Sequence, residues 1–193
     1  YYNKQMAKRR SICERMNGRH SSKRIARLTA KWNRKVEDYL HKASRKVIDL
    51  CAGQDVSVLV IGKNKGWKQE ANLGHKLNQS FVQLPFARFI QMLQYKAESI
   101  GMKVVLTEES YTSGTSFLDG EAPVKACYDK SRRVHRGLFR TSDGRKINAD
   151  VNGAYQIMRK VFPNVNADGI EGVALRPAVV TLSMSARRSS GCA

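Results

Sequence analysis

Three consecutive segments between residues 56 and 107 most strongly constrain the fold. Residues 56–62 (VSVLVIG) are a short, continuous and β-branched apolar run, which is typical of a strand buried on both faces. Residues 85–99 have apolar side chains at helical spacing, and Pro85 suits the first turn of a helix. Residues 103–107 (KVVLT) form a second strand. This order of strand, helix and strand predicts a right-handed crossover between two parallel strands, and therefore an α/β fold.

Helical periodicity also extends over residues 21–50. Ser21 or Ser22 can cap the start of this helix, and Gly53 follows its end. A shorter helix is predicted over residues 3–16. The apolar residues of the longer helix recur at steps of three and four, and they are Ile25, Leu28, Trp32, Val36, Tyr39, Ala43, Val47 and Leu50.

The crossover helix and the last helix have predicted buried faces of their own. The last helix begins at Asn148, which can cap it, and from Pro163 onward its pattern fades into a tail. Residues 110–146, between the two helices, are expected to be irregular. The predicted buried residues are Phe86, Phe89, Ile90, Leu93, Ala97 and Ile100 in the crossover helix, and Val151, Ala154, Met158 and Val161 in the last helix.

The charge of the chain predicts a polyanionic partner. Thirty-five Lys and Arg stand against 16 Asp and Glu, so the formal net charge is +19. Nucleic acid is the default partner for a domain this basic, and an anionic membrane surface is the alternative. No run of 18 apolar residues predicts a membrane span. Because 41% of the residues are hydrophobic, the composition is not that of a disordered chain.

Basic residues are the expected contacts with nucleic-acid phosphates. The helix over residues 21–50 has only Glu37, Asp38 and Asp49 to balance its basic residues, and a second basic cluster surrounds His135. An ordinary solvated helix face is the alternative interpretation. The predicted contacts are Arg24, Arg27, Lys31, Arg34, Lys35, Lys42, Arg45, Lys63, Lys65, Lys68, Arg132, Arg133 and Arg136.

The four cysteines predict neither a metal site nor a disulfide. Cys13, Cys51, Cys127 and Cys192 include no pair at CxxC spacing, so they propose no zinc site. The basic charge and the lack of a visible secretory signal favour a reducing cytoplasm, where we expect free thiols and association with the nucleoid.

Three carboxylates are candidate ligands of a divalent metal. Glu108 and Glu109 follow the strand at residues 103–107, and sites in open α/β sheets gather outside the carboxyl ends of the strands. Asp150 lies in the first turn of the last helix. Mg²⁺ takes one or two protein carboxylates together with water and phosphate oxygens, so these acids suggest phosphodiester cleavage. The alternatives are an exposed strand end for the glutamates and favourable interaction with the helix dipole for Asp150.

Two longer segments carry a resemblance to a known family. "YKAESIGMKVVLTEESYTS" followed by "INADVNGAYQI" resembles the C-terminal half of TnpB/OrfB-type transposon proteins. These are RuvC-like, RNA-guided DNA nucleases encoded by insertion sequences and related to type V CRISPR effectors. "YLHKASRKVIDLC", "LVIGKNKGWKQ" and "NQSFVQLPFARFIQML" fit the same family in the same order. The resemblance covers residues 1–162, and the shared order of the motifs makes it specific.

The resemblance implies an RNase H-like (RuvC) fold with three acids that bind Mg²⁺. These acids are an Asp on the first strand, a Glu, and an Asp at the start of a late helix, which corresponds to Asp150. The Glu usually stands where this sequence has Gly62, but a subset of the family carries it just before the YTS element, where Glu109 stands. We therefore expect Glu109 and Asp150 to be the catalytic metal ligands, with Glu108 as the fallback.

The sequence departs from the family pattern in two respects. The family often has a zinc ribbon built from two CxxC pairs, whereas the matching positions here are about Ser116, Asp119, Arg140 and Asp143, so no structural zinc is expected. The first-strand Asp would lie before Tyr1. We therefore expect the chain to be either a fragment of a longer protein or a decayed copy.

The sequence thus predicts part of an RNA-guided, Mg²⁺-dependent DNA endonuclease that acts on DNA with a guide RNA and not at a membrane. The expected domains are a nuclease-domain fragment over residues 1–162, which includes a degenerate zinc-ribbon insertion at 110–146, and a tail over 163–193. By itself the chain is expected to be inactive. The alternatives are a non-catalytic nucleic-acid-binding module and a ribosome-associated or general RNA-binding protein.

Overall fold

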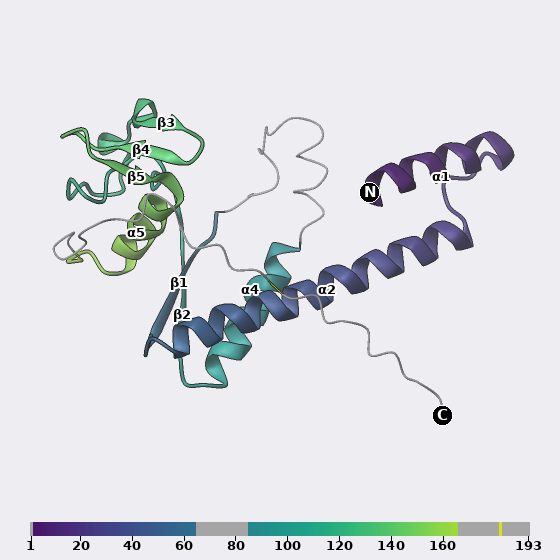
Figure 1. Ribbon diagram of the computed structural model, residues 1–193, viewed down its shortest axis with the longest axis horizontal. Coiled ribbons are helices and arrows are strands. Elements are labelled where there is room, and N and C mark those ends of the chain that lie inside the picture. Colours follow the sequence, from purple (N-terminus) through teal and green to yellow (C-terminus); the bar gives the residue numbers. More distant parts are fainter. Residues whose placement is uncertain (1, 65–84, 166–181, 183–193) are drawn as a thin grey trace.

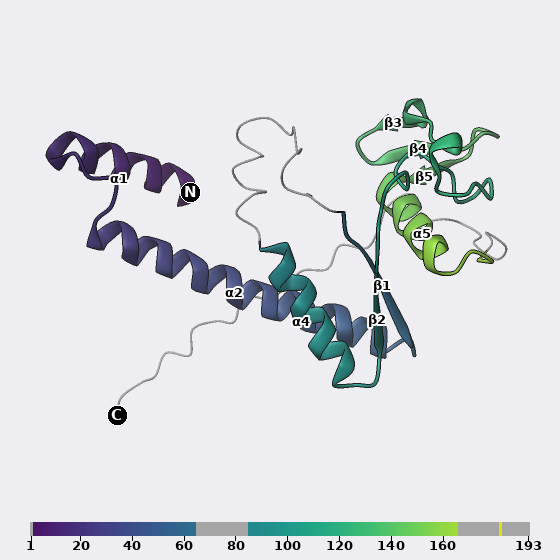
Figure 2. The same cartoon turned by 180° about the vertical axis from the view of Figure 1, so that it is seen from behind.

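The computed structural model describes residues 2–64, 85–165 and 182, and Figure 1 labels its elements. Figures 1 and 2 show α1 and α2 reaching away from one end of the β1–β2 pair, while α5 and a second sheet lie at the other end. In chain order the elements are α1 (Tyr2–Asn17), α2 (Lys23–Ala52), β1 (Val58–Gly62), α4 (Phe86–Glu98), β2 (Lys103–Thr107), two 3₁₀ turns (Lys125–Cys127 and Lys130–Arg132), β3 (Arg133–His135), β4 (Leu138–Arg140), β5 (Lys146–Asn148) and α5 (Ala149–Val161).

β1 and β2 are the parallel pair that the crossover pattern predicts. Their register runs from Val58 opposite Lys103 to Gly62 opposite Thr107. The burial expected for β1 is only partly present, because all five of its residues are half-buried. The reason is that β1 has β2 on one edge, and no other described strand pairs with its second edge.

Helices cover both faces of this strand pair. Leu59, Ile61 and Val104 pack against a buried cluster of Ile48 from α2 and Leu93, Ala97 and Met102 from α4 and the turn after it. Successive strand residues face opposite sides, so Val58 and Val60 face α5 and line an apolar cavity of about 330 Å³ with it. The core therefore consists of α2 and α4 on one face of the strands and α5 on the other.

The buried face of α2 differs from the predicted stripe. Leu40, Ser44 and Ile48 are buried, whereas Tyr39 is 57% exposed and Leu50 is 46% exposed. The predicted stripe runs one position before the buried one, because the polar Ser44 interrupts the row of Leu40 and Ile48 and an apolar pattern does not follow that row. The Ser44 hydroxyl donates a hydrogen bond to the Leu40 carbonyl (2.7 Å), so its burial leaves no unsatisfied donor.

The buried face of α4 also differs from the predicted one, because it includes Lys96. The Lys96 ammonium donates hydrogen bonds to Ser44 Oγ and to the His41 carbonyl, both at 2.7 Å. Burial lowers the pKa of Lys96, and the positive charge of Arg45 lowers it further. Met92 is also buried, whereas the predicted core residue Ile100 is 47% exposed because α4 has already ended at Glu98.

The buried face of α5 is polar rather than apolar. Asn152, Gln156 and Arg159 are buried, while the predicted core residue Ala154 is exposed. Asn152 accepts a hydrogen bond from the Phe117 amide (3.0 Å) and donates one to the Thr115 carbonyl (2.8 Å). The loop before the second sheet thus gives this helix polar partners, which an apolar pattern cannot reveal.

Residues 110–146 contain more regular structure than the sequence predicted. β3, β4 and β5 form an antiparallel sheet around Phe139 and Ile147, and β5 leads directly into α5. Each strand has three residues, which is too short for an alternating pattern to be recognised. The predicted tail over residues 163–193 lies outside the described residues except for 163–165 and 182.

The predicted helix ends are confirmed. Ser22 caps α2 by accepting a hydrogen bond from the Ile25 amide (3.3 Å), and Gly53 follows the helix.

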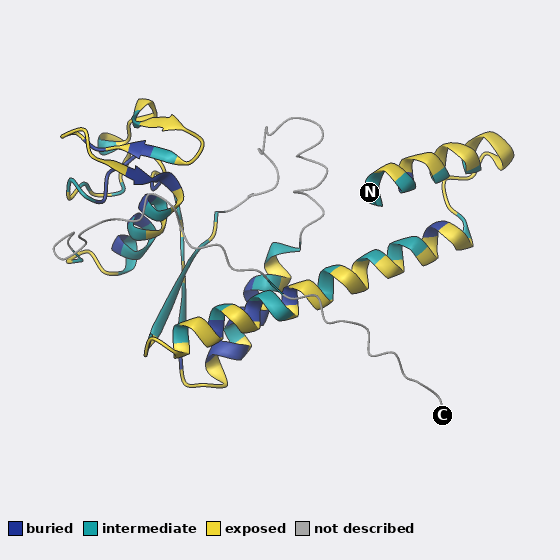
Figure 3. Cartoon of the chain, in the orientation of Figure 1, coloured by how far each residue is buried: buried dark blue, intermediate teal, exposed yellow. Residues whose placement is uncertain are grey.

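α1 packs on the first half of α2, where the rings of Tyr2 and Trp32 stack with centroids 4.8 Å apart. Figure 3 shows that most of this helical pair is exposed.

Two smaller expectations can be checked in part. Cys13, Cys51 and Cys127 are free thiols, as predicted, and Cys192 lies outside the described residues. Within residues 2–64 and 85–165 no helix combines the length and the apolar character that crossing a membrane requires.

We predict that Ile48→Ala lowers the free energy of unfolding by about 2–5 kcal/mol, the range for truncating a buried aliphatic side chain. Ile48 is 1% exposed and joins α2 to α4 and the strands. Urea denaturation measures the change. Leu50→Ala is the control, because Leu50 is 46% exposed and should lose less than about 1 kcal/mol. Similar losses in the two variants would contradict the packing described here.

Candidate metal and nucleic-acid site

The carboxyl ends of β1 and β2 hold Glu109 in place through its backbone. The Glu109 amide donates to Asn64 Oδ1 (3.1 Å), just after β1 ends. The Glu109 carbonyl accepts from the Thr112 hydroxyl (2.7 Å) and the Thr112 amide (3.3 Å), which closes a turn after β2. Because these three hydrogen bonds anchor the backbone, the place at which the Glu109 side chain begins follows from the strand pair.

The side chain of Glu109 lies beside Gly62. A Cβ built on Gly62 would lie 2.8 Å from Glu109 Oε2 and 2.8 Å from Ile157 Cδ1, closer than real Cβ atoms approach other atoms. The family resemblance implies a Glu at the position of Gly62, and here the Glu109 carboxylate lies beside that position from the neighbouring strand. Any side chain at residue 62 would have to displace it.

Asp150 enters the same region from α5. Asn148 caps this helix by accepting hydrogen bonds from the amides of Asp150 (2.9 Å) and Val151 (3.1 Å). The Asp150 carboxylate is 83% exposed, and its Oδ1 lies 3.7 Å from Nη2 of Arg133 on β3. The prediction that Asp150 lies in the first turn of the last helix is confirmed.

Glu109, Asp150 and Arg133 line one cavity of about 360 Å³. The rest of its wall consists of Asn64, Thr112, Ser113 and the α5 residues Ala149, Gly153, Ala154 and Ile157. Two acids that are 41 positions apart in the sequence therefore line the same cavity, together with a guanidinium that the sequence indicated only as a general phosphate contact. No signal in the sequence linked Arg133 to Asp150.

The two neighbouring glutamates have different environments. Burial raises the pKa of the Glu109 carboxyl, and the nearby charge of Lys160 partly offsets this effect. No described residue donates a hydrogen bond to the Glu109 carboxylate. Glu108 is exposed, accepts a hydrogen bond from the Ser110 hydroxyl (2.6 Å) and does not line the cavity. The geometry therefore favours Glu109 over Glu108 as a ligand.

The donor set fits part of a divalent-metal site. A half-buried carboxylate without a described hydrogen-bond partner and an exposed carboxylate in the same cavity are suitable oxygen ligands for Mg²⁺. Among residues 2–64 and 85–165, however, no group of three His, Cys, Asp or Glu side chains is close enough together to hold a metal. Glu109 and Asp150 could thus supply two oxygen ligands, and any further protein ligand would have to come from outside the described residues.

Most predicted phosphate contacts that the structure describes are exposed. The exposed ones are Arg24, Arg27, Lys31, Arg34, Lys35, Arg45, Lys63, Arg133 and Arg136. Lys42 is half-buried and paired with Asp38 (2.8 Å), and Arg132 is half-buried and paired with Glu121 (2.7 Å). Lys65 and Lys68 lie outside the described residues.

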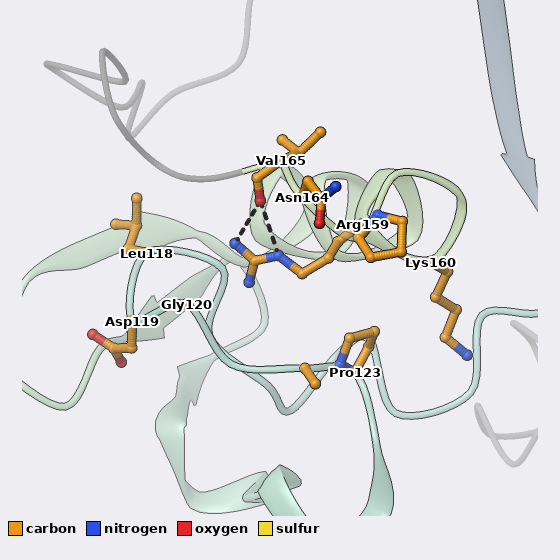
Figure 4. Close-up of a pocket in the computed structure, with 10 residues that line it drawn as sticks. Leu118, Asp119, Gly120, Pro123, Arg159, Lys160, Asn164 and Val165 are labelled. Atoms are coloured by element: carbon orange, nitrogen blue, oxygen red, sulfur yellow. Dashed lines mark hydrogen bonds between the residues drawn. The ribbon is translucent and has the colours of Figure 1, made fainter.

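A larger cavity of about 660 Å³ lies beyond the far end of α5. Arg159 and Lys160 face the loop of Leu118 to Pro123 across it, and Arg159 donates hydrogen bonds to the Val165 carbonyl at 3.1 and 3.3 Å (Figure 4). Its one carboxylate, Asp119, already accepts a hydrogen bond from the Ser142 amide (2.8 Å). The smaller cavity therefore remains the better candidate for metal-dependent chemistry.

Comparisons with known proteins identify two parts of the chain. Residues 1–68 match the OrfB_IS605 family model, described as a probable transposase, and residues 86–157 match a model described as a Cas12f1-like TNB domain. The CRISPR-associated endodeoxyribonuclease Cas12f2 of Micrarchaeota archaeon (strain CG1_02_47_40) is 26% identical over 162 residues. The aligned region is 79% of this chain but only 28% of that relative.

A solved structure has a similar fold. The cryo-EM structure of the Cas12f1–sgRNA–target DNA complex matches with a TM-score of 0.59 and 20% sequence identity. The match covers 81% of this chain and 40% of the Cas12f1 chain. At this identity the likeness concerns the fold alone. Together with the elements described above, it confirms the predicted mixed α/β fold.

We predict that Glu109→Gln stabilises the metal-free chain at neutral pH. A carboxyl whose pKa is raised by folding binds protons more tightly in the folded chain, so ionising it at neutral pH costs stability. As the pH falls through the raised pKa, the wild-type chain becomes protonated and the advantage of Gln disappears. Thermal unfolding of both chains between about pH 7 and pH 4 measures this difference. Glu108→Gln is the matched control, and an equal effect there would contradict the assignment.

Proposed function

Since this chain is a member of the TnpB-like family, we propose that it is the C-terminal part of an RNA-guided, Mg²⁺-dependent DNA endonuclease. The observation that carries this proposal is the convergence of Glu109 and Asp150 in one cavity beside Gly62. The parallel pair of strands with helices on both faces supports an RNase H-like (RuvC) fold for residues 1–162. Residues 110–146 would be the degenerate zinc-ribbon insertion, without zinc, and residues 163–193 the tail.

In this proposal Glu109 and Asp150 hold Mg²⁺. When bound, the metal would neutralise charge on the scissile phosphate and lower the pKa of an attacking water. Partial burial limits the contact of the Glu109 carboxylate with bulk solvent, and the hydrogen bonds of its amide and carbonyl fix its backbone. Asp150, at the exposed start of α5, would also contact the attacking water. Arg133 is the phosphate contact at the site, because its guanidinium reaches Asp150.

A third carboxylate would complete the site if it came from a strand paired with the free edge of β1. Among the described residues that edge has no partner strand. Parallel strands have their carboxyl ends at the same edge of a sheet, so a strand added parallel to β1 would end near the two acids.

DNA and guide RNA are the proposed partners. Cas12f1, which shares the fold, was solved in complex with an sgRNA and target DNA. Here the exposed basic residues of α2 and the Arg133–Arg136 segment would contact phosphates. Given such partners, we propose a cytoplasmic protein associated with the nucleoid.

The second candidate function is a non-catalytic nucleic-acid-binding module. Its support is that the described residues supply two acids rather than three, and that Arg133 already pairs with Asp150. In that case the carboxylates orient Arg133 and do no chemistry. Both candidates predict salt-sensitive binding, so only cleavage separates them.

We predict that the 193-residue chain binds DNA but does not cut it with Mg²⁺ present. The logarithm of the binding constant should fall linearly with the logarithm of the salt concentration, because bound phosphates release counterions. Arg27→Gln combined with Lys31→Gln should reduce this slope by about two. The control is Arg88→Gln, because Arg88 pairs with Glu37 at 3.1 Å and should leave the slope unchanged. Robust cleavage by this chain would defeat the prediction.

In the intact protein, Glu109→Ala and Asp150→Ala should each lower the rate of DNA cleavage at least about 100-fold and leave DNA binding unchanged, as expected for lost transition-state stabilisation. Gly62→Glu should also fail, since its Cβ would meet the Glu109 carboxylate at 2.8 Å. Combining Gly62→Glu with Glu109→Ala and with Ile157→Val, which removes the other atom 2.8 Å from that Cβ, should restore part of the activity by returning the acid to the usual family position. Undiminished cleavage by Glu109→Ala would favour the module.

A further inference from the structure

Four charged side chains join three separate segments of residues 110–146. Asp119 and Glu121 come from the loop after β2, Arg132 from the second 3₁₀ turn, and Arg145 from the turn between β4 and β5. We refer to these four residues as the Asp119 cluster. None of the expectations drawn from the sequence assigned them a joint role.

Short contacts connect the members of the cluster. Arg132 Nη1 lies 2.7 Å from Glu121 Oε1 and 3.6 Å from Asp119 Oδ2. Asp119 Oδ1 lies 3.9 Å from Nη2 of Arg145, and its Oδ2 accepts a hydrogen bond from the Ser142 amide at 2.8 Å. Each acid therefore interacts with at least one segment remote from it in sequence.

The cluster is also tied to its own loop and to α5. Glu121 Oε2 accepts a hydrogen bond from the Ser116 amide (2.7 Å), and the Glu121 carbonyl accepts from Arg159 Nη1 (2.9 Å). The side chains of Asp119, Glu121 and Arg132 are 11%, 20% and 21% exposed. Water screens such partly buried pairs less than surface pairs, so removing one partner leaves a charge that water solvates poorly.

These contacts join the two loops that a zinc ion would connect in a zinc ribbon. The positions that match zinc-ribbon cysteines are about Ser116 and Asp119 in the first loop, and Arg140 and Asp143 in the second. Ser142 lies inside that second pair, and Asp119 bonds to its amide. The Asp119 amide in turn donates to the Ser116 hydroxyl (3.3 Å). Ion pairs and hydrogen bonds thus link the two loops directly.

The cluster adjoins the candidate site through one peptide bond. Arg132 ends the second 3₁₀ turn and Arg133 begins β3, where its guanidinium reaches Asp150. Because Arg133 is exposed and contacts Asp150 only at 3.7 Å, its own interactions hold it weakly. The backbone of Arg133 is held by its pairing with Phe139 on β4, and the half-buried Arg132 side chain fixes the residue just before it.

We propose that the Asp119 cluster replaces a structural metal in residues 110–146, and that Arg132 acts as a positioning residue that sets Arg133 against Asp150. The first statement concerns the fold of this chain alone. The second rests on the proposed function, because it assigns Arg133 to phosphate binding at the site. Arg132 is therefore not itself a nucleic-acid contact.

Hydrogen exchange on the 193-residue chain tests the first statement. Arg132→Gln and Asp119→Asn should each speed amide exchange about tenfold in residues 129–148 and leave α2 and α4 unchanged, as local opening requires. Arg132→Lys should restore most of the protection, and EDTA should have no effect on the wild-type chain. Arg136→Gln removes the same charge from an exposed site and is the control. Faster exchange of the wild-type chain in EDTA would overturn the first statement. An effect of Arg136→Gln equal to that of Arg132→Gln would overturn it too.

Cleavage by the intact protein tests the second statement. Arg132→Gln should lower kcat about tenfold, with little change in DNA affinity, and Arg132→Lys should recover it. Because Arg132 is inferred to act through Arg133, Arg132→Gln should cost little more in the Arg133→Gln background. Additive losses would overturn the positioning role. If the wild-type protein does not cleave, the proposed function fails and the positioning role fails with it, while the exchange experiment still decides the metal-free cluster.

Discussion

The parallel pairing of β1 with β2 is the interaction on which the rest of the structure depends. Parallel strands have their carboxyl ends at the same edge, so Asn64 after β1 can accept a hydrogen bond from the Glu109 amide after β2. The same pairing gives α2 with α4 and α5 opposite faces to cover. Without it, Glu109 would have no fixed position relative to Asp150.

Polar groups hold this molecule together at the points where an apolar core is thin. Lys96 and Ser44 join α4 to α2, and Asn152 and Arg159 join α5 to the loop around Phe117. Each of these buried groups has hydrogen-bond partners, which offset much of the free-energy cost of its burial. Such contacts are directional, so they select one arrangement of the elements rather than simply adding stability.

The surface is mainly basic, and several acidic residues lie in partly buried positions. Basic residues are exposed along α2 and in the Arg133–Arg136 segment, whereas Glu109 is half-buried. Asp119 and Glu121 are largely buried beside Arg132. A carboxylate kept ionised in such a place raises the free energy of the folded chain when no cation is near. This cost is typical of functional sites, and in the Asp119 cluster arginine is the compensating cation.

The sequence by itself determined the mixed α/β fold, the crossover between β1 and β2 and the caps of α2 and α5, because these follow from local spacing and turn chemistry. It also indicated Glu109 and Asp150 through a family resemblance. Only the tertiary structure decided that Ser44, Lys96 and Asn152 are buried, that Arg133 faces Asp150, and that Arg132 pairs with Glu121. The physical reason is that a polar side chain can be buried only where the fold brings a hydrogen-bond or charge partner to it. That partner is remote in sequence, and periodicity carries no information about it.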